Sequence, residues 1–162
     1  MIILNFLFLI SAAVYAKNNK CSFSQSNIAA NWTLTSTGIQ IQFSNSNLAN
    51  NQWTGIIFGD SMDSLSMIIF ENLNNQVIVQ TGSMSGIGNE ALDSTSQATV
   101  QYTNITGKVL DALVSLPSTF DGVDLTACHT WRFLETGAMT NGQMGQMITS
   151  PISVSNVCPS KC

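Results

Sequence analysis

The chain has 162 residues, of which only 9% are charged and 44% are apolar, and its formal net charge is −4. A typical soluble domain carries about 25% charged residues, so solubility here depends on the abundant Asn, Ser, Thr and Gln side chains. The five Lys and Arg residues are scattered and form no basic surface of the kind that binds nucleic acid or an anionic membrane. Both are therefore poor candidate partners.

The first segment of the chain has the properties of a secretory signal peptide. Residues 1–16 form an uncharged apolar run that ends in the small-residue pattern Val14-Tyr15-Ala16, which predicts cleavage after Ala16. The run is too short to span a membrane. The mature chain, residues 17–162, has the usual size of one domain. Neither a GPI signal nor a transmembrane tail follows, so we expect a secreted, extracellular protein without membrane insertion.

Several short segments of the mature chain alternate apolar and polar residues, which is the pattern of strands with one buried face. Clusters of Asn, Gly and Ser separate these segments and are typical of turns. Short strands at fairly regular spacing predict an all-β sandwich or barrel. The alternating segments are 32–34, 39–43, 65–69, 77–79 and 129–133, and the turn clusters are 45–47, 72–75, 86–89 and 141–142.

Two further segments are less regular. Residues 108–116 tolerate a helix, but they also alternate, with Leu110, Ala112, Val114 and Leu116 on one side. We therefore predict a strand with one apolar face. The Gly-, Asn- and Ser-rich stretch 82–96 predicts one long loop, and long loops in compact domains are often functional or mobile.

Four cysteines follow the predicted signal peptide, namely Cys21, Cys128, Cys158 and Cys162. An even number in a chain routed to an oxidising compartment predicts two disulfides, for which three connectivities are possible. We expect Cys21 and Cys128 to pair with the two C-terminal cysteines, because such bridges would pin both ends of the chain. A zinc site is not expected, since His129 is the only histidine and secretion favours oxidation.

Two sequons are candidate N-glycosylation sites in a eukaryotic secretory pathway. They are the Asn-Trp-Thr triplet at Asn31 and the Asn-Ile-Thr triplet at Asn104. Because Asn31 falls in a predicted strand, we expect it to be buried and less accessible than Asn104.

Several sequence blocks together resemble the DOMON family, in the order and spacing of secreted single-domain members from nematodes. The resemblance extends from Cys21 to Cys162. It implies an immunoglobulin-like β-sandwich of two mostly antiparallel sheets, which the disulfides would stabilise. It also implies a pocket that holds b-type haem in some relatives and is thought to hold sugars in others. The blocks read QWTGIIFGDSMD at 52–63, MIIFEN at 67–72, VQTG at 79–82, CHTWRF at 128–133 and GQMGQM at 142–147.

The resemblance also implies candidate haem ligands. Met62 stands where the haem-binding relatives have an axial methionine, and a thioether is a soft ligand suited to iron. The second family ligand is a histidine near the C-terminal strand, where this chain has Met147, with Met144 as a fallback. Haem would then need two thioethers or one weak ligand. His129 alternates with apolar strand residues and is interpreted as structural. Met67 is interpreted as a core residue.

The sequence offers little for catalysis, and we expect no enzyme. One histidine and nine carboxylates provide few acid–base pairs, and no nucleophile elbow, zinc helix or phosphate-binding loop is present. Two acidic pairs, Asp60 with Asp63 and Asp121 with Asp124, could suggest calcium. Each pair is too small for the usual coordination shell, so we interpret these residues as turn residues or caps.

We therefore expect a secreted, non-catalytic ligand-binding module. The first candidate ligand is haem b, held by Met62 and Met147 for electron transfer with an extracellular redox partner. A second hypothesis is a module that binds a glycan or another small molecule, with Trp32, Trp53 or Trp131 as stacking platforms. A third is an extracellular interaction protein without a small ligand.

Overall fold

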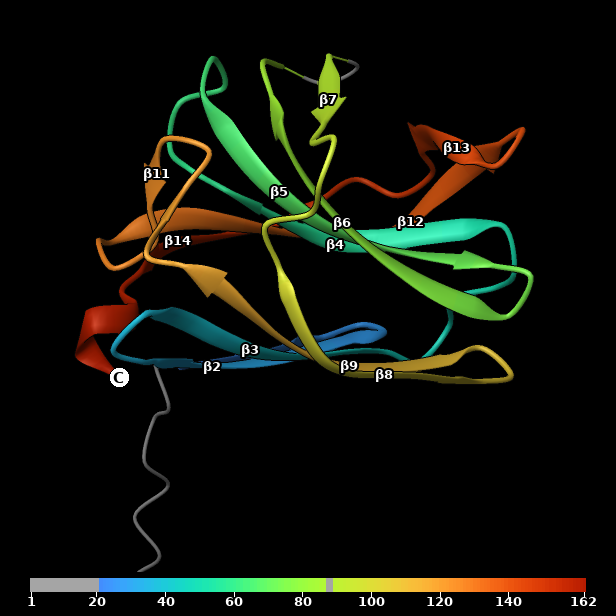
Figure 1. Ribbon diagram of the computed structural model, residues 1–162, viewed down its shortest axis with the longest axis horizontal. Helices are drawn as coiled ribbons and strands as arrows, with labels where there is room; N and C mark the ends of the chain where they lie inside the picture. The colour runs from blue at the N-terminus through green and yellow to red at the C-terminus, as the bar shows by residue number, and fades with distance from the viewer. Residues whose placement is uncertain (1–20, 87–88) are drawn as a thin grey trace, which may run out of the picture.

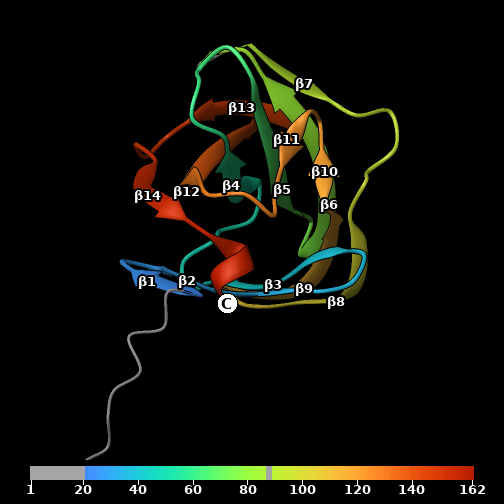
Figure 2. The same ribbon diagram turned by 90° about the vertical axis from the view of Figure 1, so that its left-hand side faces the viewer.

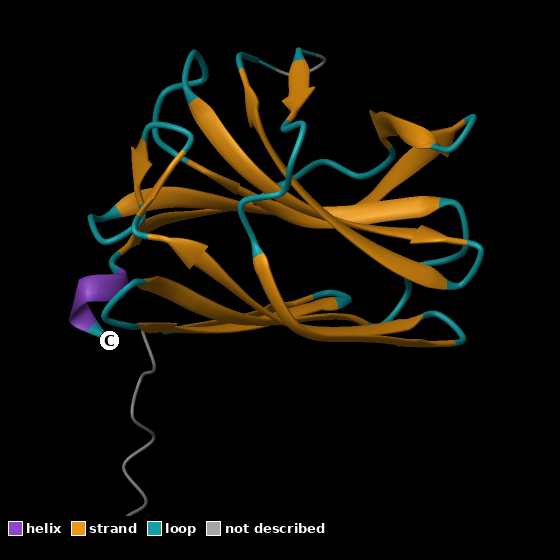
Figure 3. Cartoon of the chain, viewed as in Figure 1, coloured by secondary structure: helices purple, strands orange, loops and turns teal. Residues whose placement is uncertain are grey.

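The structure is a computed structural model that describes residues 21–86 and 89–162. Most of these residues lie in strands, and the strands form two layers that face each other (Figures 1 and 3). The predicted signal peptide lies outside the described residues. Within the described part of the chain, the helical element is the short 3-10 helix η1 (Pro159–Lys161), and no helix there is long and apolar enough to cross a membrane.

The first layer is a five-stranded antiparallel sheet in the order β1-β2-β3-β9-β8. It forms the lower layer of Figure 1. Its strands are β1 (Ser22–Gln25), β2 (Ile28–Leu34), β3 (Gly38–Asn45), β8 (Thr99–Thr106) and β9 (Val109–Pro117).

The second layer is a seven-stranded sheet in the order β13-β12-β4-β5-β6-β7, in which β14 also pairs with β12. β13 and β14 share one edge of β12, because β13 pairs with the end of that long strand and β14 with its start. The strands are β4 (Gln52–Phe58), β5 (Leu65–Leu73), β6 (Gln76–Met84), β7 (Glu90–Leu92), β12 (His129–Thr140), β13 (Gln143–Met147) and β14 (Ile152–Val157); β10 (Thr119–Phe120) and β11 (Val123–Asp124) form a separate hairpin.

The alternating segments form strands as predicted. β9 buries Leu110, Ala112, Val114 and Leu116 and leaves the residues between them partly or fully exposed, so the predicted strand at 108–116 is confirmed. These side chains point into the sandwich and meet the inward residues of the opposite sheet. Aromatic rings join the layers, with ring centroids 4.8 Å apart for Phe43 and Phe70 and 4.7 Å apart for Trp32 and Trp131.

A small polar network crosses this apolar interior. Asn45 of β3 is 1% exposed, and its side-chain amide donates to the Thr54 hydroxyl of β4 at 2.9 Å and to the Glu135 carbonyl oxygen of β12 at 2.8 Å. The Thr54 hydroxyl in turn donates to the Leu134 carbonyl oxygen at 2.6 Å. The network therefore ties β3 of one sheet to β4 and β12 of the other at a defined position.

Three expectations from the sequence are wrong. The stretch 82–96 is not one loop, because the end of β6 pairs with β7, for example Gly82 with Leu92. The segment 65–69 is not half-buried, because β5 is covered on both faces. Asn31 is exposed rather than buried, because it points outward from β2 between two inward residues. Asn104 is also exposed, so both sequons are accessible.

Both disulfides lie beside η1, because Cys158 and Cys162 flank this short helix at one end of the sandwich (Figure 2 shows η1). Cys21 pairs with Cys162, and Cys128 pairs with Cys158. The expectation that Cys21 and Cys128 pair with the two C-terminal cysteines is thus confirmed, and the structure selects one of the possible combinations. The first bridge joins the two ends of the described chain, and the second ties the start of β12 to the end of β14.

Candidate functional site

A second apolar cluster lies on the outer face of the seven-stranded sheet, which points away from the five-stranded sheet. Leu65, Met67 and Ile69 of β5 point to this face, because they alternate with residues that join the inter-sheet core. The β12–β13 hairpin contributes methionines that cover the cluster, which explains why β5 is buried on both faces. The cluster consists of Trp53, Ile57, Leu65, Met67, Ile69, Met84 and Leu134, with Met139, Met144 and Met147 packed against it.

A cavity of about 200 Å³ lies beside this cluster, and we call it the methionine pocket. Its lining includes Met62, Met84, Met147 and Arg132. The two methionines that the sequence pointed to, Met62 and Met147, therefore line one site although they are far apart in the chain. The remaining lining residues are Ile57, Leu65, Pro151 and Ser153.

Met62 lies in the loop between β4 and β5, and it is 41% exposed. Gly59 and Asp60, at the start of this loop, are hydrogen-bonded to β12. The Gly59 amide donates to the Thr130 carbonyl oxygen at 3.1 Å, and the Gly59 carbonyl oxygen accepts from Arg132 Nη1 at 2.7 Å. Asp60 then accepts from the Thr130 amide at 2.8 Å. The loop therefore leaves the sheet in a fixed direction and carries Met62 to the mouth of the pocket.

His129 holds the same loop through a second contact. Its Nδ1 lies 3.0 Å from a carboxylate oxygen of Asp60, and its Nε2 lies 2.9 Å from the carbonyl oxygen of Asp124. These two contacts place the imidazole between the β4–β5 loop and β11. The hydrogen bonds from His129 and from the Thr130 amide lower the pKa of Asp60. His129 thus positions the loop, and it does not line the methionine pocket.

The hairpin that carries Met147 is fixed by the indole of Trp53. The indole N–H donates to the carbonyl oxygen of Gly145 in β13 at 3.2 Å. The ring also packs directly on Gly137 of β12, where an added β-carbon would overlap the indole atoms. Residues 141–142, which both have positive φ (53° and 74°), form the tight turn. Trp53 and Gly137 together therefore set where Met147 lies on the sheet.

Two residues of the pocket, Met84 and Arg132, were not singled out from the sequence. Met84 falls in the segment predicted as a loop, but it ends β6 and is only 3% exposed. Arg132 lies between two buried residues of β12, Trp131 and Phe133, and so points to the opposite face. That alternation was visible in the sequence and could have placed Arg132 on the outer side of the sheet.

The other methionine candidates lie elsewhere. Met144 lines a different cavity, of about 460 Å³, together with Glu71 and Gln80. Glu71 is 2% exposed, and this burial raises its pKa, although its carboxylate accepts a hydrogen bond from Gln80 Nε2 at 3.0 Å. Met67 is fully buried in the outer cluster, so its interpretation as a core residue is confirmed.

Three residues of the acidic pairs, Asp60, Asp121 and Asp124, accept hydrogen bonds within the protein. Asp124 accepts from the amide and the hydroxyl of Thr126 at 2.9 Å and 2.6 Å, and these bonds lower its pKa. Asp121 accepts from Gln97 Nε2 at 2.6 Å. In residues 21–86 and 89–162, no group of three or more His, Cys, Asp or Glu side chains could hold a metal ion.

The three tryptophans considered as stacking platforms are all buried. Trp32, Trp53 and Trp131 are 3%, 1% and 0% exposed. Trp32 and Trp131 belong to the inter-sheet core, and Trp53 belongs to the outer cluster. None of them therefore presents an exposed ring face on which a sugar could stack.

The comparisons with known proteins agree with this architecture. Residues 24–137 match the family model of the DOMON domain. The chain belongs to the DOMON family. This DOMON domain is 32% identical over 154 residues to a DOMON domain-containing protein of Caenorhabditis elegans, with 91% of each chain covered. A DOMON domain-containing protein of Caenorhabditis briggsae is 32% identical over 157 residues, which cover 91% of this chain and 92% of the relative.

The fold also has a solved counterpart. This DOMON domain is similar in structure to the cytochrome domain of Myriococcum thermophilum cellobiose dehydrogenase, with a TM-score of 0.60. The match covers 83% of this chain and 80% of that one, at 8% sequence identity. Both the resemblance to the family and the predicted β-sandwich are therefore confirmed.

Proposed function

We propose that this DOMON domain is a secreted, non-catalytic binding module that takes up haem b in the methionine pocket, with Met62 and Met147 as axial ligands. The observation that carries the proposal is that these two methionines, from the β4–β5 loop and from β13, line one cavity. Thioethers are soft ligands that suit haem iron. The similarity in fold to a cytochrome domain supports the same ligand.

The other residues of the pocket suit a haem in their chemistry. Ile57, Leu65 and Pro151 supply apolar walls, and Arg132 supplies a cation that can pair with a propionate carboxylate. The cavity of about 200 Å³ is smaller than the usual 300–1,000 Å³ of ligand pockets, so uptake requires an outward movement. Met62 is the side chain that can move outward, because it is exposed and follows the part of its loop that is hydrogen-bonded to β12.

A bound haem would supply one-electron chemistry, and the protein would determine where and in which orientation that chemistry occurs. The outer cluster is buried and would exclude water from the site, whereas Met62 is 41% exposed, so a redox partner would approach from the side of Met62. The two disulfides suit a protein that works in an oxidising compartment.

A small apolar molecule is the second candidate ligand. The cavity volume favours it, because a ligand smaller than haem could enter without displacing the Met62 loop. A glycan is disfavoured at this site, since none of the described residues that line it is aromatic.

The test is an ultraviolet–visible titration of the purified, disulfide-intact protein with haem, in the oxidised and reduced states. We expect a saturable, low-spin spectrum that is lost in Met62→Leu and in Met147→Leu, because leucine keeps the apolar volume but removes the sulfur. Met144→Leu is the matched control and should bind haem as the parent does, because Met144 lies outside the pocket. Unchanged binding in both ligand variants, or weak and non-saturating absorbance in the parent, would refute haem ligation.

A further inference from the structure

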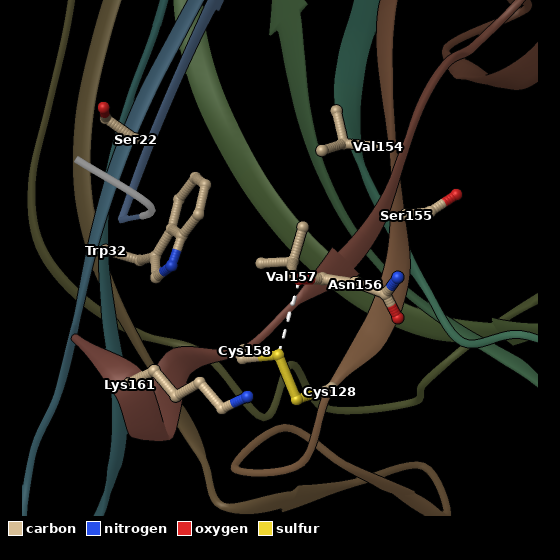
Figure 4. A pocket seen from close by; sticks show the side chains of 9 residues that line it. All are labelled: Ser22, Trp32, Cys128, Val154, Ser155, Asn156, Val157, Cys158 and Lys161. Carbon is tan, nitrogen blue, oxygen red and sulfur yellow. Dashed lines mark hydrogen bonds between the residues drawn. A yellow bond between two sulfur atoms is a disulfide. The ribbon is translucent and has the colours of Figure 1, made fainter. Parts of the chain in front are cut away.

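A third cavity, separate from the methionine pocket and from the cavity beside Glu71, lies at the end of the sandwich where the disulfides are found. Its volume is about 560 Å³, which is within the usual range for small-molecule sites. It lies between β2 of the first sheet and β14 with η1 on the other side (Figure 4). Its lining includes Trp32, Val154, Asn156, Val157, Lys161 and the Cys128–Cys158 disulfide.

Trp32 contributes an indole nitrogen that is buried without a partner. Trp32 is 3% exposed, and its Nε1 has no hydrogen-bond acceptor within the described part of the chain. The indole nitrogen of Trp131 is in the same state, but Trp131 packs behind Trp32, at 4.7 Å between ring centroids, and does not line the cavity. In Figure 4 the nitrogen-bearing edge of the Trp32 ring faces the end of the cavity where Cys158 and Lys161 lie. Buried indole N–H groups usually find an acceptor, so that of Trp32 is poised to donate to a molecule in the cavity.

The charge and polarity of the lining define the ligand. The indole of Trp32 and the ammonium of Lys161 can only donate hydrogen bonds. None of the described residues that line the cavity is acidic, so Lys161 gives it a positive charge in a protein whose net charge is −4. Val154 and Val157 form an apolar wall opposite the indole. A molecule that satisfies all three features has an anionic acceptor and an apolar body.

We propose that this cavity binds a small carboxylic acid, whose carboxylate accepts from Trp32 Nε1 and pairs with Lys161 while its apolar body packs on Val154 and Val157. The site is independent of the methionine pocket and of its ligand, because the two cavities share no lining residue.

The test uses sodium octanoate as the probe and 1-octanol as its neutral counterpart, with the disulfide-intact protein. In a ¹H–¹⁵N spectrum we expect the Trp32 indole signal to shift on addition of octanoate. The Trp53 indole signal should stay in place, because that N–H is already bonded to Gly145. A Trp32→Phe spectrum assigns the signal. Calorimetry should show saturable octanoate binding and much weaker octanol binding.

Two variants measure the contribution of each donor. Trp32→Phe should weaken octanoate binding by about tenfold or more, as expected for the loss of a hydrogen bond to a charged group. Lys161→Gln should weaken it by about 2–5-fold, since the ammonium is exposed. Lys108→Gln, at an exposed lysine outside the cavity, is the matched control and should leave binding unchanged. Equal affinity for octanol and octanoate, an unshifted Trp32 signal, or parental octanoate affinity in Lys161→Gln would each overturn the proposal.

Discussion

The side-chain amide of Asn45 donates a hydrogen bond of 2.9 Å to the hydroxyl of Thr54, and this bond joins the two sheets through their shared interior. Asn45→Ala should lower the free energy of unfolding by about 1–3 kcal/mol, because the Glu135 carbonyl oxygen loses a buried donor. Urea denaturation with an unchanged m-value measures this loss. Ser24→Ala, at an exposed position of β1 outside both sequons, is the control. Equal losses in the two variants would argue against a role for the network.

The contact between Gly137 and the Trp53 ring can be tested by adding a single methyl group. Gly137→Ala places that methyl where the indole atoms lie, so the hairpin must shift. We expect a loss of about 1–3 kcal/mol in the free energy of unfolding, as for other overpacked sites. The ring signals of Trp53 in the NMR spectrum should move as well. A stable variant with unmoved Trp53 signals would show that the packing of this ring does not position β13.

The two disulfides should contribute unequally to stability. Cys21–Cys162 has a sequence separation of 141 residues and Cys128–Cys158 one of 30. On the chain-entropy model, their removal costs about 5 and about 3.6 kcal/mol, so the serine pair at Cys21 and Cys162 should be the less stable variant. Thermal denaturation of the two double-serine variants tests this order. The reverse order would mean that the loop length does not decide the effect.

Glu71 should make stability depend on pH in the direction opposite to that of a surface carboxylate in an ion pair. Burial raises its pKa above 4.5, so the folded state binds its proton more tightly than the unfolded state does. This contribution is fully present below pH 4.5 and is lost as the pH rises through the folded pKa. Glu71→Gln should therefore be more stable than the parent at about pH 7, with the gap closing at about pH 4. Parallel stability curves would contradict this.

Alternation in the sequence was sufficient where one face of a strand meets the core and the other meets solvent. β9 shows this, since its buried side is the side that the pattern indicated. The pattern failed for β5, because the β12–β13 hairpin covers its second face. The sequence of β5 alone does not show that a segment far away in the chain packs on it. It failed in a different way at Asn31, where a polar residue in a strand was taken to share the burial of its neighbours.

The candidate site was predictable only in part, for a related reason. Met62 and Met147 were found because a family motif marks them. Met84 joins them in the pocket because β6 continues through Gly82 to pair with β7, and a Gly- and Ser-rich sequence gives no hint of that pairing. The composition of that stretch describes a loop, whereas its backbone hydrogen bonds are those of a hairpin.

The disulfide between Cys21 and Cys162 closes the described chain into a covalent ring, so a single proteolytic cut does not separate it into two molecules. A single cut in the exposed segment between β7 and β8, for example after Ser94 or Thr95, produces two fragments that each keep one of these cysteines. The fragments remain linked and stay held together by the paired strands. A nicked molecule would therefore migrate as an uncut one on a non-reducing gel, and as two fragments once a reductant cleaves the Cys21–Cys162 disulfide.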